Sequence, residues 1–181
     1  GTPALRQAIK DWLTRRYALT AGLIDPERHV LAVAGSREAL FMAALVATPR
    51  QKVRRWSAVL MPNPLYQVYY GAAVAAGAEP ILLPATKANG FQPDLGALPR
   101  DLLDRTALVY LNSPANPQGS VLSRAQLDAA IKLARLHDFF LFNDAATSEI
   151  YTGDAPAGAL SAAATELTTP GRDRSTGRAL P

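Results

Sequence analysis

The chain has 181 residues, of which 49% are hydrophobic, 19% charged and 7% aromatic, and its formal net charge is +4. This is the composition of an ordinary folded protein, and the length suffices for one domain with a real core, so disorder of the whole chain is excluded. The absence of cysteine excludes disulfides, thiolate catalysis and cysteine zinc sites. The two histidines, His29 and His137, have no third ligand in view, so we expect no metal site.

Neither a nucleic acid nor a membrane is expected as a partner. The densest basic run is Arg50, Lys52, Arg54 and Arg55. It fits a phosphate or nucleic-acid patch or a solvated connecting loop, and the lack of accompanying aromatic residues favours the loop. The most apolar long stretch, residues 65–84, is broken by polar residues, glycine and proline, so it predicts no membrane span. No signal peptide is visible, and we expect a cytoplasmic protein.

Helices and strands are predicted to alternate along the chain. Thr2 and Pro3 begin a helix whose apolar residues recur every fourth position, and short apolar runs bounded by turn residues predict buried strands. The expected elements are a helix over residues 2–17, a strand over 30–34, a helix over 38–48, a strand over 58–61, a helix over 66–76, strands over 81–83 and 107–111, a helix capped by Ser123, and a fifth strand over 139–142.

This alternation predicts an α/β fold with a mostly parallel sheet and helices on both faces. Residues 1–166 are expected to form the folded unit. Residues 167–181 are polar, rich in glycine and proline and without periodicity, which predicts a disordered or aberrant tail.

Four features fall where the strands end, which is the edge at which open parallel sheets bind ligands. Gly35, Ser36 and Arg37 join a strand to a helix, so they suit either an anion site or a plain glycine turn with a serine N-cap. Tyr66 follows two prolines after the next strand, where its ring fits stacking on a flat ligand or ordinary packing. The third feature is the loop over residues 112–119, which follows the fourth predicted strand, and the fourth feature is Asp144.

In the loop over residues 112–119, two X-Pro bonds and a closing glycine fix the position of Asn116, and one of those bonds could be cis. A rigid turn is the alternative. Asp144 follows a buried strand, where a carboxylate needs a cationic partner, either an arginine or a protonated ring nitrogen. An aspartate that merely caps a helix or lies in a loop is the alternative there.

Together, five segments resemble the class I/II aminotransferases that use pyridoxal 5′-phosphate (PLP) in a fold of type I, over residues 1 to about 163. They read GTPALRQAIKDWLTRRY, AGSREALF, PNPLYQVYYGAAVAAGAEP, NSPANPQGSVLSRAQL and NDAATSEIY. The segments GSREALF and PNPLYQVYYGAA most resemble the bacterial N-succinyl-diaminopimelate aminotransferases of lysine biosynthesis. The resemblance implies that residues 1–166 are part of the large, PLP-binding domain.

The resemblance also implies a role for each residue at this edge. Ser36 and Arg37 would hold the cofactor phosphate through the start of their helix, and Tyr66 would stack on the pyridine ring. Asn116 would donate to the phenolic oxygen, and Asp144 would pair with the protonated pyridine nitrogen. Thr147 stands where relatives have a tyrosine that also contacts the phenolic oxygen.

The family's Schiff-base lysine lies in a Ser-x-Ser-Lys segment that this sequence does not contain. We therefore expect a chain truncated at both ends, without a catalytic residue of its own and inactive alone. For the parent enzyme, the resemblance implies a homodimer that transfers an amino group between an amino acid and a 2-oxo acid, with N-succinyl-LL-2,6-diaminopimelate and 2-oxoglutarate expected. Another fold-type-I aminotransferase, a C–S lyase and a non-catalytic pseudoenzyme are the alternatives.

Overall fold

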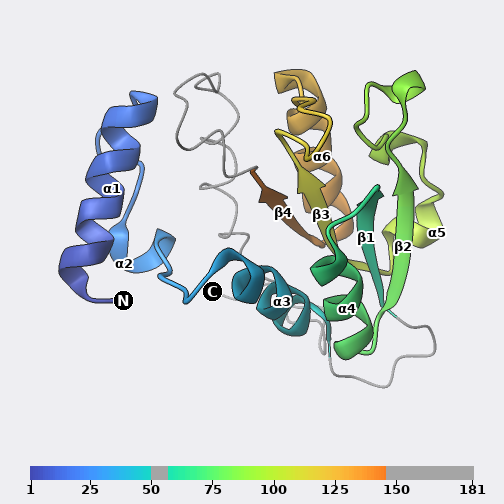
Figure 1. Ribbon diagram of the computed structural model, residues 1–181, viewed down its shortest axis with the longest axis horizontal. Helices are drawn as coiled ribbons and strands as arrows, with labels where there is room; N and C mark the ends of the chain where they lie inside the picture. The colour runs from blue at the N-terminus through green and yellow to red at the C-terminus, as the bar shows by residue number, and fades with distance from the viewer. Residues whose placement is uncertain (50–56, 146–181) are drawn as a thin grey trace.

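The computed structural model describes residues 1–49 and 57–145, and its centre is a parallel sheet (Figure 1). The strands are β1 (Ala58–Asn63), β2 (Glu79–Pro84), β3 (Thr106–Asn112) and β4 (Phe140–Asp144). They lie in the order β2-β1-β3-β4, and every neighbouring pair is parallel.

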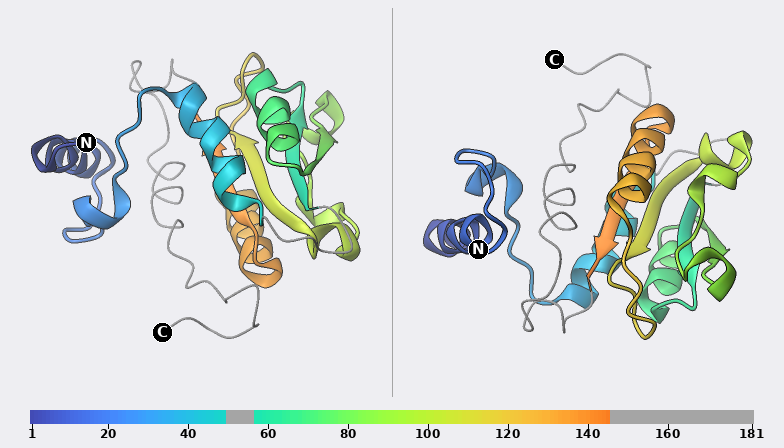
Figure 2. Two further views of the ribbon diagram at one scale, coloured as in Figure 1. Left: turned by 90° about the horizontal axis from the view of Figure 1, so that it is seen from below. Right: turned by 90° about the horizontal axis from the view of Figure 1, so that it is seen from above.

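Helices and short turns connect these strands. The helices are α1 (Pro3–Tyr17), α2 (Pro26–His29), α3 (Ser36–Ala47), α4 (Gln67–Ala75), α5 (Arg100–Leu103) and α6 (Arg124–His137), and the 3-10 turns are η1 (Lys87–Asn89) and η2 (Leu95–Ala97). Figure 2 shows α3 and α4 on one face of the sheet and α6 on the other. The predicted fold class, with a parallel sheet and helices on both faces, is confirmed.

Alternate residues along β1 serve two hydrophobic cores. Val59 and Met61 pack in the core formed with α3 and α4, whereas Ala58 and Leu60 pack in the core formed with α5 and α6. Since successive side chains of a strand point to opposite faces, a strand buried on both sides must be apolar throughout. This is why an uninterrupted apolar run marked the strand in the sequence.

The helices α1 and α2 lie side by side, apart from the sheet (Figures 1 and 2). As predicted, Thr2 caps α1, and its hydroxyl accepts a hydrogen bond from the Leu5 amide at 3.3 Å. The Arg6 guanidinium joins the two helices through Glu27 Oε2 at 2.6 Å. The Glu27 side chain is largely exposed, so we expect this ion pair to stabilise the arrangement by less than about 1 kcal/mol.

The strand predicted over residues 30–34 is wrong. The segment has no regular structure, and Leu31 and Val33 are 82% and 49% exposed. A strand requires a neighbour that completes its backbone hydrogen bonds, and none of the strands in the described residues pairs with this segment. Instead it borders an apolar hollow of about 690 Å³ between α3 and β4. Apolar composition was therefore not enough to make a strand.

Several element boundaries also differ from the prediction, and two of these differences concern the candidate site. The helix expected from residue 38 begins at Ser36, because the Ala39 amide bonds to the Gly35 carbonyl at 3.1 Å. Gly35 is therefore the N-cap, and the alternative of a serine N-cap is wrong. The strand expected to end at residue 142 continues to Asp144, which is paired with Asn112 of β3. The carboxylate thus belongs to the strand itself.

Several sequence predictions concern residues outside the described ranges. These are the basic run from Arg50 to Arg55, Thr147 and the tail over residues 167–181. Within residues 1–49 and 57–145, no helix combines the length and apolar character needed to cross a membrane. The same residues hold no cluster of three or more side chains suited to binding a metal ion.

Candidate functional site

The carboxyl ends of β1, β3 and β4 meet at one edge of the sheet because the strands are parallel. Asp144 is the last residue of β4, Asn116 lies in the loop that follows β3, and Tyr66 precedes α4 in the connection that follows β1. Arg37 joins them from the start of α3 through its contact with Tyr66. The predicted site residues other than Thr147 therefore come from segments that lead to or from this edge.

Asp144 is held by a buried tyrosine. The Tyr69 hydroxyl donates to Asp144 Oδ2 at 2.6 Å, and the Tyr69 ring stacks on Tyr110 with centroids 4.4 Å apart and planes inclined by 13°. Burial, followed by the hydrogen bond to Asp144, raises the pKa of Tyr69 far above its ordinary value, so the phenol keeps its proton. Tyr69 is therefore a permanent donor to the carboxylate.

The Asp144 carboxyl lies half-buried without a cation beside it. Burial raises the pKa of Asp144, and the hydrogen bond from Tyr69 acts in the opposite direction. No arginine, lysine or histidine of the described ranges forms an ion pair with it. The positive partner that the sequence argument expects for this carboxylate is therefore not a described side chain.

Tyr66 links the start of α4 to the start of α3. Its hydroxyl accepts a hydrogen bond from Arg37 Nε at 2.8 Å, and the guanidinium carbon lies 5.8 Å from the ring centroid. The ring also meets Tyr69 edge-on, with centroids 5.9 Å apart. It remains 38% exposed, so part of its surface is available to a ligand.

The first turn of α3 suits an anion. The first amides of a helix have no partner within the helix, and no side chain caps this one. Ser36 and Arg37 are exposed, and beyond Gly35 and its two chain neighbours no atom lies within 4 Å of the place that a Cβ on Gly35 would occupy. Together with the helix dipole, this open turn is the kind of site that binds phosphate groups.

Two asparagines tie the loop after β3 to the end of β4. Asn143 accepts from the Ser113 amide at 3.1 Å and donates to the Ser113 carbonyl at 2.9 Å. With its amide turned to the orientation that satisfies its neighbours, Asn112 donates to the carbonyls of Asp144 and Pro114, each at 2.9 Å. Both X-Pro bonds of the loop are cis, where the sequence had suggested one. Asn116 itself is exposed beyond these contacts.

Sequence reasoning missed Tyr69, although a signal for it was present. It lies three residues after Tyr66, so the two rings share one side of α4, and a tyrosine in an alanine-rich buried helix needs a partner for its hydroxyl. The sequence could not name that partner, because Asp144 lies 75 residues further along the chain.

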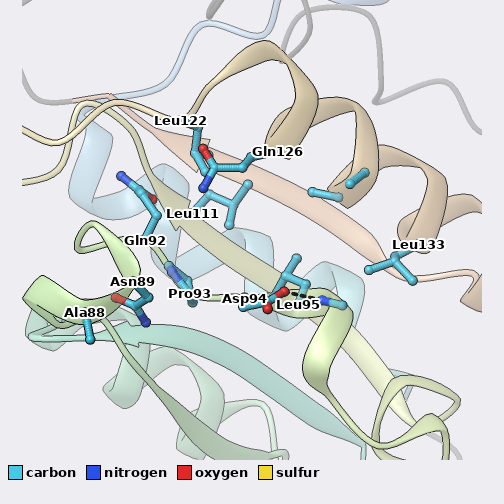
Figure 3. Close-up of a pocket in the computed structure, with 13 residues that line it drawn as sticks. Ala88, Asn89, Gln92, Pro93, Asp94, Leu95, Leu111, Leu122, Gln126 and Leu133 are labelled. Atoms are coloured by element: carbon cyan, nitrogen blue, oxygen red, sulfur yellow. Dashed lines mark hydrogen bonds between the residues drawn. The ribbon is translucent and has the colours of Figure 1, made fainter.

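A second hollow, of about 490 Å³, lies between α6 and residues 88–96 (Figure 3). Its polar side chains are engaged in turns and caps. Asn89 accepts from the Thr86 amide and donates to the Pro84 carbonyl, Asp94 accepts from the Gly96 amide, and Gln126 accepts from the Ser123 amide. Because these groups already stabilise the local backbone, the hollow is a less suitable candidate than the sheet edge.

Comparison with known proteins decides the family. A model of the aminotransferase class I and II family matches residues 1–170. The chain belongs to this family. The LL-diaminopimelate aminotransferase of Moorella thermoacetica is 37% identical to this aminotransferase-family chain over 150 residues, which are 83% of this chain and 36% of that protein.

Solved aminotransferase structures share the fold. The aminotransferase of Neisseria meningitidis is 37% identical with a TM-score of 0.79, over 94% of this chain and 42% of that one. A probable N-succinyldiaminopimelate aminotransferase of Thermus thermophilus is 30% identical with a TM-score of 0.63, over 77% of this chain and 35% of that one. The aminotransferase-family chain thus spans less than half the length of these relatives. The family depends on PLP.

Proposed function

We propose that this chain binds PLP at the carboxyl edge of its sheet and serves amino transfer between an amino acid and a 2-oxo acid. The observation that carries the proposal is the half-buried Asp144 carboxylate, which has a hydrogen-bond donor in Tyr69 but no cation among the described residues. A protonated pyridine nitrogen supplies that missing positive charge. The chemistry of the residues at this edge therefore fits the cofactor of the family.

Each predicted residue contributes a group of the right kind. The open first turn of α3, with Ser36 and Arg37, would hold the phosphate, and the half-exposed ring of Tyr66 would stack on the pyridine. Asn116 would donate to the phenolic oxygen, and Asp144 would pair with the ring nitrogen. Thr147, outside the described residues, would lie beside the phenolic oxygen. When bound, PLP supplies an electron sink for bonds at the substrate α-carbon.

The contribution of Asp144 is electrostatic. An ionised carboxylate beside a ring nitrogen favours the protonated form of that nitrogen, and the attraction is stronger at a half-buried position than in water. A neutral carboxyl group would lose this effect. The proposed function therefore requires that Asp144 stays ionised near neutral pH despite the burial that raises its pKa.

For the substrate, we propose a diaminopimelate-type amino donor and 2-oxoglutarate as the acceptor, in lysine biosynthesis. The relative from Moorella thermoacetica supports LL-diaminopimelate, whereas the one from Thermus thermophilus supports its N-succinyl derivative. Of the two we propose N-succinyl-LL-2,6-diaminopimelate, on the resemblance of segments 35–41 and 62–73. The proposal includes a homodimer, as the family resemblance implies, and a cytoplasmic location.

Cofactor binding is tested by titrating the purified chain with pyridoxamine 5′-phosphate, which binds without a covalent bond to the protein. We expect saturable binding by calorimetry, with pyridoxamine, which lacks the phosphate, binding at least tenfold more weakly because the first turn of α3 holds the anion. No detectable binding of pyridoxamine 5′-phosphate would contradict the proposal.

The substrate is tested on the complete translation product of the gene. Glutamate formation from 2-oxoglutarate is measured with N-succinyl-LL-2,6-diaminopimelate, LL-diaminopimelate and aromatic amino acids as donors. We expect the highest kcat/KM with the succinylated donor. A preference for LL-diaminopimelate would support amino transfer in lysine biosynthesis but contradict the succinylated donor. Turnover of aromatic donors alone would overturn the assignment to lysine biosynthesis.

A further inference from the structure

We propose that Tyr69 is a positioning residue, whose phenol fixes one oxygen of Asp144 and so aims the other at the cofactor nitrogen. The inference rests on the proposed function, because it gives the carboxylate its target. Oδ2 accepts from Tyr69 at 2.6 Å. Tyr69 is the only side-chain donor to Asp144 among residues 1–49 and 57–145, and it contacts Oδ2 rather than Oδ1.

A series of buried contacts holds the Tyr69 hydroxyl in place. The Tyr69 ring is fully buried and stacks on Tyr110, which is also fully buried. The Tyr110 hydroxyl in turn donates to the Leu40 carbonyl of α3 at 2.5 Å. Aromatic side chains have few rotatable bonds, so a stacked and hydrogen-bonded pair presents its hydroxyl in one orientation. The orientation of Asp144 therefore derives from the packing of α3 and α4 on the sheet.

The same contact counteracts the effect of burial on charge. Burial raises the pKa of Asp144 and would favour the neutral carboxyl, whereas the phenol donates to the charged form and lowers it. Because burial also raises the pKa of Tyr69, that phenol stays protonated near neutral pH, where the carboxylate has to be ionised. Tyr69 can thus keep Asp144 both ionised and oriented.

Tyr69 also connects the carboxylate to the residue proposed to stack on the cofactor ring. Its ring meets Tyr66 edge-on with centroids 5.9 Å apart and planes inclined by 87°. Tyr66, which would stack on the cofactor ring, and Tyr69, which holds the partner proposed for the ring nitrogen, thus belong to a single aromatic cluster with Tyr110. A displacement of Tyr69 would disturb both contacts.

The test compares Tyr69→Phe with Tyr110→Phe. Each variant keeps a buried ring and loses one buried hydroxyl, but only the first loses a donor to Asp144. The titration of the Asp144 carboxyl is followed by carbon-13 NMR without any ligand. We expect its midpoint to move upward in Tyr69→Phe and to stay at the wild-type value in Tyr110→Phe. Equal midpoints in all three proteins would overturn the inference.

Binding of pyridoxamine 5′-phosphate provides the second measurement. We expect Tyr69→Phe to bind about tenfold more weakly than the wild type, the size of one hydrogen bond to a charged group. In an Asp144→Asn background the same substitution should have no further effect, because Tyr69 acts through the carboxylate. An equal loss in both backgrounds would show a merely structural role and overturn the inference.

The two proposals fail in different ways. If the wild-type chain binds no pyridoxamine 5′-phosphate, the proposed function fails, and the aim of Asp144 loses its target with it. If the wild-type chain binds the ligand but Tyr69→Phe leaves both the Asp144 midpoint and the affinity unchanged, only the role of Tyr69 fails. Circular dichroism of each variant verifies that the helices and the sheet are intact.

Discussion

The hollow beside α6 and the carboxyl edge of the sheet use polar side chains in opposite ways. In the hollow beside α6, Asn89, Asp94 and Gln126 complete caps and turns of the backbone. At the carboxyl edge, Asp144 keeps a half-buried carboxylate without a cation in the described residues, and the first turn of α3 has no side-chain cap. The carboxylate of the hollow, Asp94, is exposed and accepts from a turn amide, whereas that of the edge, Asp144, is half-buried, and the first turn of α3 is uncapped. Binding capacity therefore follows the unpaired groups rather than the volume.

Tyr110→Ala should have the largest effect, because the carboxyl edge depends on the aromatic stack. Removing this fully buried ring leaves a cavity next to Tyr69 and should lower the free energy of unfolding by about 3–5 kcal/mol. Urea unfolding measures the loss. Leu31→Ala is the control, since a side chain 82% exposed should change stability by less than about 0.5 kcal/mol. A loss below about 1 kcal/mol in Tyr110→Ala would contradict the role of the stack.

Asp144→Asn should separate binding from folding. It removes the charge but keeps the shape, so we expect affinity for pyridoxamine 5′-phosphate to fall about 30-fold, or about 2 kcal/mol, with the fold retained. Asp94→Asn is the matched control in the hollow beside α6. It should leave the affinity unchanged, because Asp94 accepts a hydrogen bond from the Gly96 amide and lies away from the edge. Equal affinities in the two variants would remove the distinction between the regions.

Ser123→Ala should show the reverse pattern. Ser123 and Gln126 form a capping box at the start of α6, and losing such a cap lowers stability by about 1 kcal/mol. Thermal unfolding should detect this change, while the affinity for pyridoxamine 5′-phosphate remains that of the wild type. A weakened affinity would mean that the α6 side is coupled to the edge.

The smallest effect should be a pH dependence of stability that Asp144 causes. Burial raises the pKa of Asp144 in the folded state, so between the unfolded and folded pKa values the folded protein binds more protons than the unfolded one. The contribution of Asp144 to stability is thus present at low pH and is lost as pH rises through that window. Urea titrations should show this decline in the wild type but not in Asp144→Asn. Parallel profiles would contradict the raised pKa.

The sequence predicted much of this architecture because buried parallel strands are apolar throughout. The runs at residues 58–61 and 107–111 met that condition and form β1 and β3. The run at residues 30–34 also met it and forms no strand, since composition does not show whether a neighbouring strand exists to pair with it. Strand pairing is a property of the assembled sheet, which local patterns do not contain.

The candidate site was also predictable from the sequence only in part. Because parallel strands end at one edge of a sheet, the sequence predicted that Tyr66, Asn116 and Asp144 lie at the same end, and their segments do meet there. The contact between Tyr69 and Asp144 was not predictable, because it depends on how α4 packs over β3 and β4. The cofactor-binding roles all stay predictions, those of Ser36, Arg37, Tyr66, Asn116, Asp144 and Thr147.

The side chain of Asn143 makes the two hydrogen bonds that a backbone residue of a paired strand would make. It bonds to both backbone groups of Ser113, as a residue of a neighbouring strand would, and so extends the pairing of β3 and β4 into the loop. The loop that contains Asn116 is therefore hydrogen-bonded to the strand that ends with Asp144, although 28 positions separate the two residues in the sequence. A slip of β4 by one residue would displace both at once, so their spacing is preserved or lost as a unit.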